Sequence, residues 1–182
     1  MKLNLKEAIT LALLGALMFC SKLLTESIPN VHFLAMFIIA YTVVFRFKAL
    51  YAIFTFIMLV GLFYGFGIWW IPYFYLWPIL WGVTMLLPKK MPTISIGKIS
   101  FNLAFPVYMI VAGLHGLCYG TLYAPFQALV YGFDFQKTIA WIIAGLPWDV
   151  THCIGNICAS TLTLPVISGL KRAMKAANIG QP

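Results

Sequence analysis

Long apolar runs separated by short polar breaks organise this chain of 182 residues. A helix that crosses a bilayer takes about 20 mostly apolar residues. We expect one crossing in each of the apolar runs, at about residues 8–24, 31–45, 49–64, 68–87, 104–130 and 139–170. The second and third runs are short, so their helices are expected to extend into the flanking residues. The pattern predicts an all-α integral membrane protein in which residues 1–182 form a single domain with six transmembrane helices.

Composition narrows the class of protein. Apolar residues make up 63% of the chain and charged residues 9%, and the mean hydropathy is +0.96. Soluble domains carry about 25% charged residues, so this chain has too few polar side chains to cover a surface in water. The six helices use up the length, which excludes a separate soluble catalytic or ATP-binding domain.

The net charge of +8 indicates membrane topology rather than nucleic-acid binding. Cytoplasmic loops of membrane proteins are rich in Lys and Arg. With six crossings, only Lys22 and Lys137 fall near the outer side. The other basic residues fall on the opposite side: Lys2, Lys6, Arg46, Lys48, Lys89, Lys90, Lys98, Lys171, Arg172 and Lys175. We therefore expect a multi-pass protein of the cell membrane with both termini in the cytoplasm.

Aromatic residues gather towards the expected outer side, around Trp69, Trp70 and Tyr73. Trp and Tyr often form belts at both membrane interfaces, which is one interpretation of this cluster. The cytoplasmic helix ends carry no Trp, and this asymmetry favours an outward cavity lined by aromatic side chains. The outer loops that would border such a cavity are residues 25–30, 65–72 and 131–138.

The sixth apolar run contains polar residues that are costly to bury in a bilayer. Asp149, His152 and Asn156 follow one another at i, i+3 and i+7, which places them on one helical face. Pro147 interrupts the helical hydrogen bonds just before them. An intramembrane acid is a functional hypothesis by default. The alternative is a structural pair in which Asp149 holds His152 while Asn156 bonds another helix, and the two roles can coexist.

Other polar residues give weaker signals. His115 and Tyr119 stand at i, i+4 in the fifth run, where His115 is as compatible with packing as with ligand contact. Lys22 and Glu26 are also at i, i+4 and could form a simple ion pair. His32 follows the first outer loop and faces either that loop or a cavity.

Alanines at positions 8, 12 and 16 form a stripe of small residues along the first helix. In lipid, such a stripe allows another helix to approach closely. Ala8, Ala12 and Ala16 are therefore compatible with either an internal helix contact or a partner subunit.

Motifs of several enzyme classes are missing from the sequence. It contains no GxxxxGK[ST], HExxH or GxSxG motif, so nucleotide hydrolysis within this chain is excluded. The four cysteines include no CxxC pair, so neither a zinc site nor a disulfide framework is expected.

The six-helix layout, the alanine stripe and the segment from Gly145 to Asn156 together resemble the S-components of energy-coupling factor (ECF) transporters. S-components are the substrate-binding membrane subunits of these ABC-type vitamin importers. The resemblance covers essentially the whole chain. Its most specific element is the position of the alanine stripe in the first helix of a basic six-helix protein.

The resemblance implies that Ala8, Ala12 and Ala16 dock onto the transmembrane coupling subunit of the importer. Two ABC ATPase subunits would hydrolyse ATP, so this chain would be no enzyme and would hold no cofactor or metal. The substrate would enter an outward pocket and leave on the inside when the protein topples in the bilayer. Candidate substrate-binding residues are Asp149, His152, Asn156, His115, Tyr119, Trp69, Trp70, Tyr73, Trp148 and His32.

An aromatic pocket with few charges favours a large or flat, mostly uncharged vitamin. We expect cobalamin first, because it is large and because a histidine could approach its cobalt or its corrin amides. Queuosine precursors, riboflavin and thiamin stay open, since Asp149 or Glu26 would suit a cationic ring. Folate fits poorly, because its carboxylates call for Arg on the outer side.

Two other classes of protein remain. A small polytopic membrane enzyme would use Asp149 and His152 as an acid–base pair and would turn over without partners. A structural subunit would have no ligand, and Asp149 would then be a packing residue only.

Overall fold

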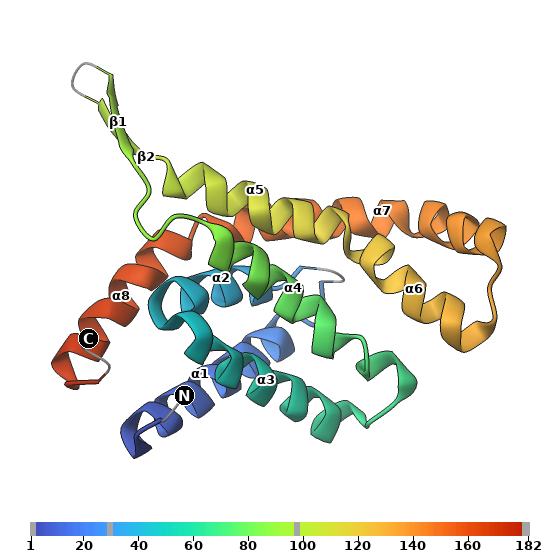
Figure 1. Ribbon diagram of the computed structural model, residues 1–182, viewed down its shortest axis with the longest axis horizontal. Coiled ribbons are helices and arrows are strands. Elements are labelled where there is room, and N and C mark those ends of the chain that lie inside the picture. Colours follow the sequence, from blue (N-terminus) through green and yellow to red (C-terminus); the bar gives the residue numbers. More distant parts are fainter. Residues whose placement is uncertain (1–2, 29–30, 97–98, 180–182) are drawn as a thin grey trace.

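The computed structural model describes residues 3–28, 31–96 and 99–179, and these are mostly helical (Figure 1). The predicted helical fold class is thus confirmed. Four residues of the predicted loops and charge pattern lie outside the described residues, namely Lys2, Pro29, Asn30 and Lys98. The elements are α1 Leu5–Leu24, α2 Leu34–Phe45, η1 Arg46–Lys48, α3 Ala49–Tyr64, η2 Ile68–Trp70, α4 Tyr73–Leu86, β1 Thr93–Ile96, β2 Ile99–Asn102, α5 Ala104–Leu117, α6 Tyr119–Tyr131, α7 Phe135–Ser160 and α8 Thr163–Ala176.

Several helical stretches have the length and hydropathy of membrane spans. In the described part of the chain these are Leu5–Leu24, Leu34–Tyr64 and Ala104–Tyr131. A fourth is obtained if α7 and α8, which meet at a bend of 48°, form one broken span. These stretches support membrane association of the chain.

The first three helices alternate in direction. Lys48, at the start of α3, contacts Glu7 at the start of α1. At the other end, Tyr64 of α3 lies within hydrogen-bond distance of Lys22 of α1. Thus α1 and α3 run parallel, and α2 runs back between them. The reversal occurs at Arg46, whose positive φ of 52° precludes a continuous helix.

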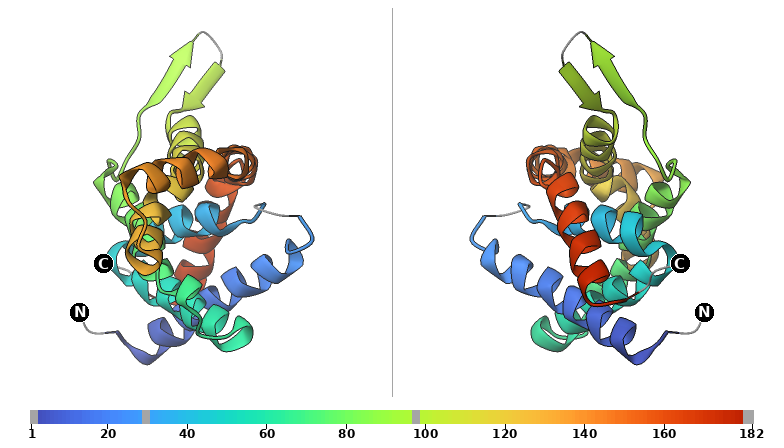
Figure 2. Two further views of the ribbon diagram at one scale, coloured as in Figure 1. Left: turned by 90° about the vertical axis from the view of Figure 1, so that its right-hand side faces the viewer. Right: turned by 90° about the vertical axis from the view of Figure 1, so that its left-hand side faces the viewer.

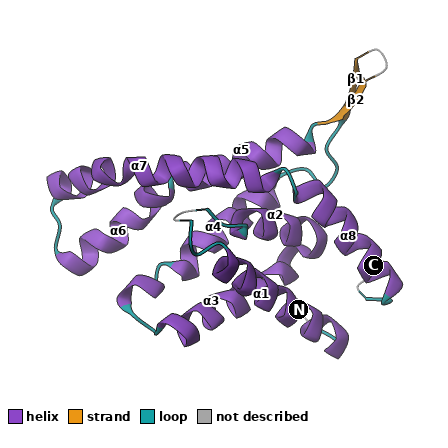
Figure 3. Ribbon diagram, turned by 180° about the vertical axis from the view of Figure 1, so that it is seen from behind, coloured by secondary structure: helices purple, strands orange, loops and turns teal. Residues whose placement is uncertain are grey.

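The remaining helices continue this alternation. Arg46 donates a hydrogen bond to the carbonyl of Met85 at the end of α4, while Tyr73 at its start lies near Lys22. His115, late in α5, is bonded to the Leu76 carbonyl early in α4. Helix α7 lies along α5 and continues along α6, as seen from behind in Figure 3. The helices therefore form an up-and-down bundle with two distinct ends.

Two features differ from the predicted pattern. The fifth and sixth apolar runs are each divided, at Cys118 and at residues 161–162, so each of these crossings would be broken. The polar segment after α4 forms a short antiparallel hairpin with Thr93 opposite Asn102, a small addition to an otherwise helical chain. The hairpin stands apart from the helices in both views of Figure 2.

The core is centred on α2, in which every residue from Leu34 to Thr42 is buried. Close approach of α1 to α3 depends on Gly15: a Cβ at this position would lie 2.6 Å from the Ala52 carbonyl oxygen. The small residue at the internal α1–α3 contact is therefore Gly15 rather than a member of the alanine stripe.

Candidate functional site

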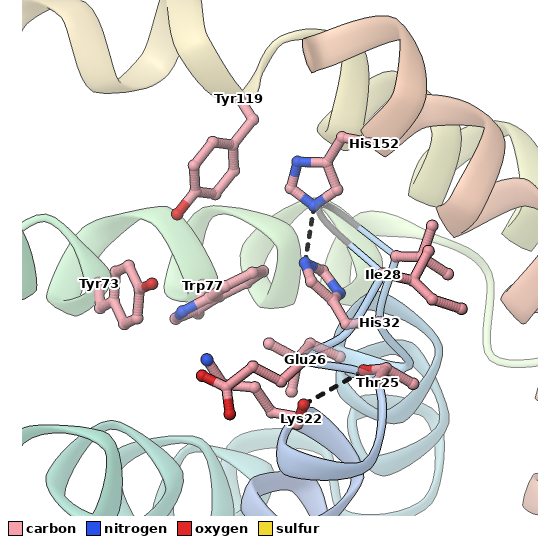
Figure 4. Close-up of a pocket in the computed structure, with 11 residues that line it drawn as sticks. Lys22, Thr25, Glu26, Ile28, His32, Tyr73, Trp77, Tyr119 and His152 are labelled. Atoms are coloured by element: carbon pink, nitrogen blue, oxygen red, sulfur yellow. Dashed lines mark hydrogen bonds between the residues drawn. The ribbon is translucent and has the colours of Figure 1, made fainter. Parts of the chain in front are cut away.

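Two neighbouring cavities lie at the end of the bundle where α1 and α3 finish and α4 begins. The first, of about 260 Å³, is shown in Figure 4 between the α1–α2 connection and helices α4, α6 and α7. The second, of about 330 Å³, lies between α6 and α7. Tyr119 and His152 line both cavities, so these two side chains form the boundary between them.

Polar groups from α1 line one side of the first cavity. Lys22 lies over the ring of Tyr64, 4.4 Å from its centroid, and its Nζ is 3.4 Å from the Tyr64 hydroxyl. That hydroxyl donates a hydrogen bond of 2.8 Å to Glu26. Tyr64, which was not predicted at the site, therefore bridges Lys22 and Glu26, for which a direct pair was expected.

Two histidines close the other side of the first cavity. The Nε2 atoms of His32 and His152 are 2.8 Å apart and share one hydrogen bond. His32 lies in the connection before α2, and its Nδ1 is buried with no partner among the described residues. Burial lowers the pKa of His32 well below its ordinary value, and the neighbouring His152 lowers this pKa further. The pair is therefore held neutral at its His32 end, with one Nε2 donating to the other.

Trp77 of α4 forms the floor beneath these groups. It is 1% exposed, and its ring packs against Tyr73, His115, Tyr119 and His32 at centroid distances of 5.7–5.9 Å. The connection before α2 and helices α5 and α6 therefore all contact one indole of α4.

The second cavity is mostly aromatic. Its rings come from α6 and from the first half of α7, and Tyr123 stacks on Trp141 with centroids 6.1 Å apart. Trp148, expected at the site, lines this cavity and is 61% exposed. Asp149 and Gln127 add polar groups to the wall.

Asp149 is 5% exposed and is held by the backbone of α6. The Gly120 amide donates to both carboxylate oxygens, at 3.0 and 3.2 Å. A side chain at Gly120 would collide with the carboxylate, because a Cβ there would lie 2.5 Å from Oδ2. The alternative in which Asp149 holds His152 is corrected: Asp149 bonds Gly120, whereas His152 bonds His32.

Four of the expected site residues serve other contacts and line neither cavity. Asn156 is fully buried and donates to the Ala112 carbonyl at 3.1 Å, so it joins α7 to α5. His115 bonds the Leu76 carbonyl. Trp70 donates to the Ile57 carbonyl, and the Trp69 carbonyl accepts from Tyr123. Each of these residues thus makes a contact within the protein, and its expected contact with substrate stays a prediction.

The alanine stripe lies on the outer flank of α1. Ala12 is exposed and Ala8 and Ala16 are partly exposed, next to the exposed side chains of Leu5 and Ile9. The stripe is therefore free to contact a second protein, while Gly15 makes the internal contact.

Three residues that line the cavities, Trp77, Tyr123 and Trp141, are not among those predicted from the sequence. Trp77 was visible only as one of several aromatics in an apolar run. Tyr119 and Tyr123 stand at i, i+4, a spacing that places them on one face, but their partners on α7 are distant in sequence.

Comparison with known proteins adds no family assignment. No family model matches the chain, and no curated protein and no solved structure is significantly similar to it. No group of three or more metal-ligating side chains occurs in residues 3–28, 31–96 and 99–179.

Proposed function

We propose that the protein is the membrane-embedded substrate-binding subunit of an ECF-type vitamin importer. The observation that carries this proposal is the division of the bundle into two ends. Cavities lined by aromatic and polar side chains lie at one end. At the other end, Arg46 donates to the carbonyl of Met85 at the end of α4, and Lys48 pairs with Glu7 at the start of α1. This division suits a binding subunit that accepts a ligand on one side of a membrane and contacts cytoplasmic partners on the other.

Six crossings follow if α1, α2, α3, α4, the α5–α6 pair and the α7–α8 pair each traverse the bilayer once. The alternating directions of these helices support this count. Helix α2, at 12 residues, is about 18 Å long and shorter than the hydrocarbon layer of about 30 Å. Because α2 is enclosed by its neighbours, protein rather than lipid surrounds its ends.

Orientation follows from the positive charges. Lys48 and Met174 of α8 line one small cavity with Glu7, so the starts of α1 and α3 and the end of α8 share one side. The basic residues Lys171, Arg172 and Lys175 belong to this last helix. The positive-inside rule then places both termini in the cytoplasm and the two cavities on the outer side.

The exposed alanine stripe supports a docking role towards the coupling subunit. In this proposal ATP is hydrolysed by two ABC ATPase partners, and the chain itself supplies substrate recognition. Because Gly15 already makes the close contact between α1 and α3, the stripe is not needed for internal packing.

The cavities bear on the choice of vitamin. With volumes of about 260 and 330 Å³, each is at or below the lower end of ordinary ligand pockets. The Nε2 atoms of all three histidines are engaged within the protein. These two features favour a vitamin smaller than cobalamin, because cobalamin would fit only if the two cavities merged and widened.

Ligand retention tests the proposal. The detergent-purified protein is incubated with a mixed vitamin pool, washed, and examined by absorbance and mass spectrometry. A retained vitamin would support the assignment of the chain as an S-component, and a corrin absorbance band would identify that vitamin as cobalamin. If no vitamin is retained and no ATPase subunit co-purifies, the proposal fails.

A further inference from the structure

The second cavity combines aromatic faces with one buried acid. Tyr123 and Trp141 stack against each other on its wall, and Trp148 and Tyr119 complete the set of rings. Asp149 is the acidic residue among the side chains that line it. Gln127 adds a neutral amide.

Asp149 is buried without a compensating charge. Of the residues that the structure describes, no Lys or Arg lies within ion-pair distance of its carboxylate, and Lys137 of the same helix pairs with Asp134 instead. The Gly120 amide supplies hydrogen bonds but no net charge. Burying a carboxylate without a cation costs free energy. A cation that enters the cavity would compensate the charge of Asp149, and this gain would favour its binding.

The rings favour the same class of ligand. Cations bind the faces of Trp and Tyr through the ring quadrupole, and cages of such rings recognise organic ammonium groups. An anionic ligand would meet a like charge at Asp149, and a neutral ligand would leave this charge uncompensated.

We infer that the second cavity binds the positively charged group of an organic cation, with Asp149 as its counter-charge. This inference rests on the proposed function, because it names the chemical class of the imported substrate. The cavity volume of about 330 Å³ suits an alkylammonium group or a single charged heterocycle. The first cavity, reached across Tyr119 and His152, would hold the remainder of the molecule.

Tryptophan fluorescence of the purified protein tests the inference, since Trp141 and Trp148 line the cavity. The probes are choline and phenyltrimethylammonium, with 3,3-dimethylbutan-1-ol as the neutral isostere of choline. We expect both cations to bind and the neutral isostere to bind at least about tenfold more weakly. Asp149→Asn should weaken cation binding at least about tenfold while it preserves the acceptor for the Gly120 amide.

Asp134→Asn is the matched control, because Asp134 caps the same helix through the Lys137 amide and lies outside the cavity. It should leave cation binding unchanged. The Asp149→Asn protein should also be at least as resistant to thermal unfolding as the wild type when no ligand is present. Trp148→Leu provides a second variant at an exposed position and should weaken cation binding without loss of fold.

The inference is overturned if neither cation binds, if the neutral isostere binds as tightly as choline, or if both Asp149→Asn and Trp148→Leu leave cation binding unchanged. Failure of the inference is distinct from failure of the proposed function. A chain that retains a neutral or anionic vitamin and co-purifies with ABC ATPases would still be an S-component.

Discussion

His32 and His152 share a hydrogen bond of 2.8 Å between their Nε2 atoms, although 120 residues separate them in sequence. The bond ties the connection between α1 and α2 to the middle of α7. Because His152 lines both cavities, this bond lies at the boundary between the two parts of the candidate site.

Acid should destabilise the protein through His32. Burial lowers the pKa of His32 in the folded chain, so below an unfolded-state pKa of about 6.5 the unfolded state binds more protons. The groups that face His32 are His152, His115 and Lys22, which disfavour its protonated form, and Glu26 across the cavity. Stability should therefore fall by up to about 1.4 kcal/mol per pH unit as the pH drops below about 6.5.

Thermal unfolding in detergent between about pH 8 and about pH 5 measures this effect. His32→Gln keeps a hydrogen-bonding group opposite His152 but cannot titrate, so its unfolding temperature should change less with pH. Equal pH dependence in the two proteins would contradict the assignment to His32.

Gly15 should be intolerant of even one methyl group. The added Cβ of Gly15→Ala would lie 2.6 Å from the Ala52 carbonyl oxygen, so α1 must move away from α3 at a cost of about 1–3 kcal/mol. Gly169→Ala is the control, because a Cβ there meets nothing within 4 Å. That variant should instead gain about 0.5–1 kcal/mol from helix propensity. Thermal unfolding of the two variants gives the comparison, and equal stabilities would exclude the close α1–α3 contact.

The alanine stripe should be required for coupling but not for ligand binding. Ala12→Trp combined with Ala16→Trp places bulk on the exposed flank of α1, so vitamin uptake and complex formation should be abolished while vitamin binding is retained. Leu17→Trp adds similar bulk on another face of the same helix, where Leu17 is 48% exposed, and should leave uptake intact. Loss of vitamin binding in the alanine variant would refute the docking role of this face.

Asn156 should matter for stability rather than affinity. Asn156→Ala removes the hydrogen bond to the Ala112 carbonyl, and polar contacts between membrane helices contribute about 0.6–1.7 kcal/mol. We expect a lower unfolding temperature and an unchanged dissociation constant for the retained vitamin. A large loss of affinity for the vitamin in a variant of normal stability would indicate that Asn156 contacts the vitamin.

The helical class of the fold could be predicted from the sequence because long apolar runs indicate helices, whereas the breaks at Cys118 and at residues 161–162 could not. Helix rotations could not be predicted in this way. Asp149 and His152 share a face of α7 as predicted, yet each takes a partner from a different segment, Gly120 and His32. Such partners are set by long-range packing, which periodicity within one helix does not report.

The antiparallel pair of β1 and β2 could not be predicted from the apolar pattern. The alternation of apolar and polar residues there is short, and the paired residues Thr93 and Asn102 are both exposed, so no buried face marks the two strands. Similarly, the alanine stripe was visible as a pattern, but its exposure depends on Gly15 making the internal contact instead.

The central claim is that this chain works as the binding subunit of a larger importer. Native mass spectrometry of the tagged protein, extracted in mild detergent from the membranes of the cell that makes it, tests this most directly. We predict a complex that contains one coupling subunit and two ABC ATPase subunits, and that is lost when Ala12 and Ala16 are both replaced by Trp. A chain that is isolated alone under these conditions, with neither ATPase nor vitamin bound, would contradict the account.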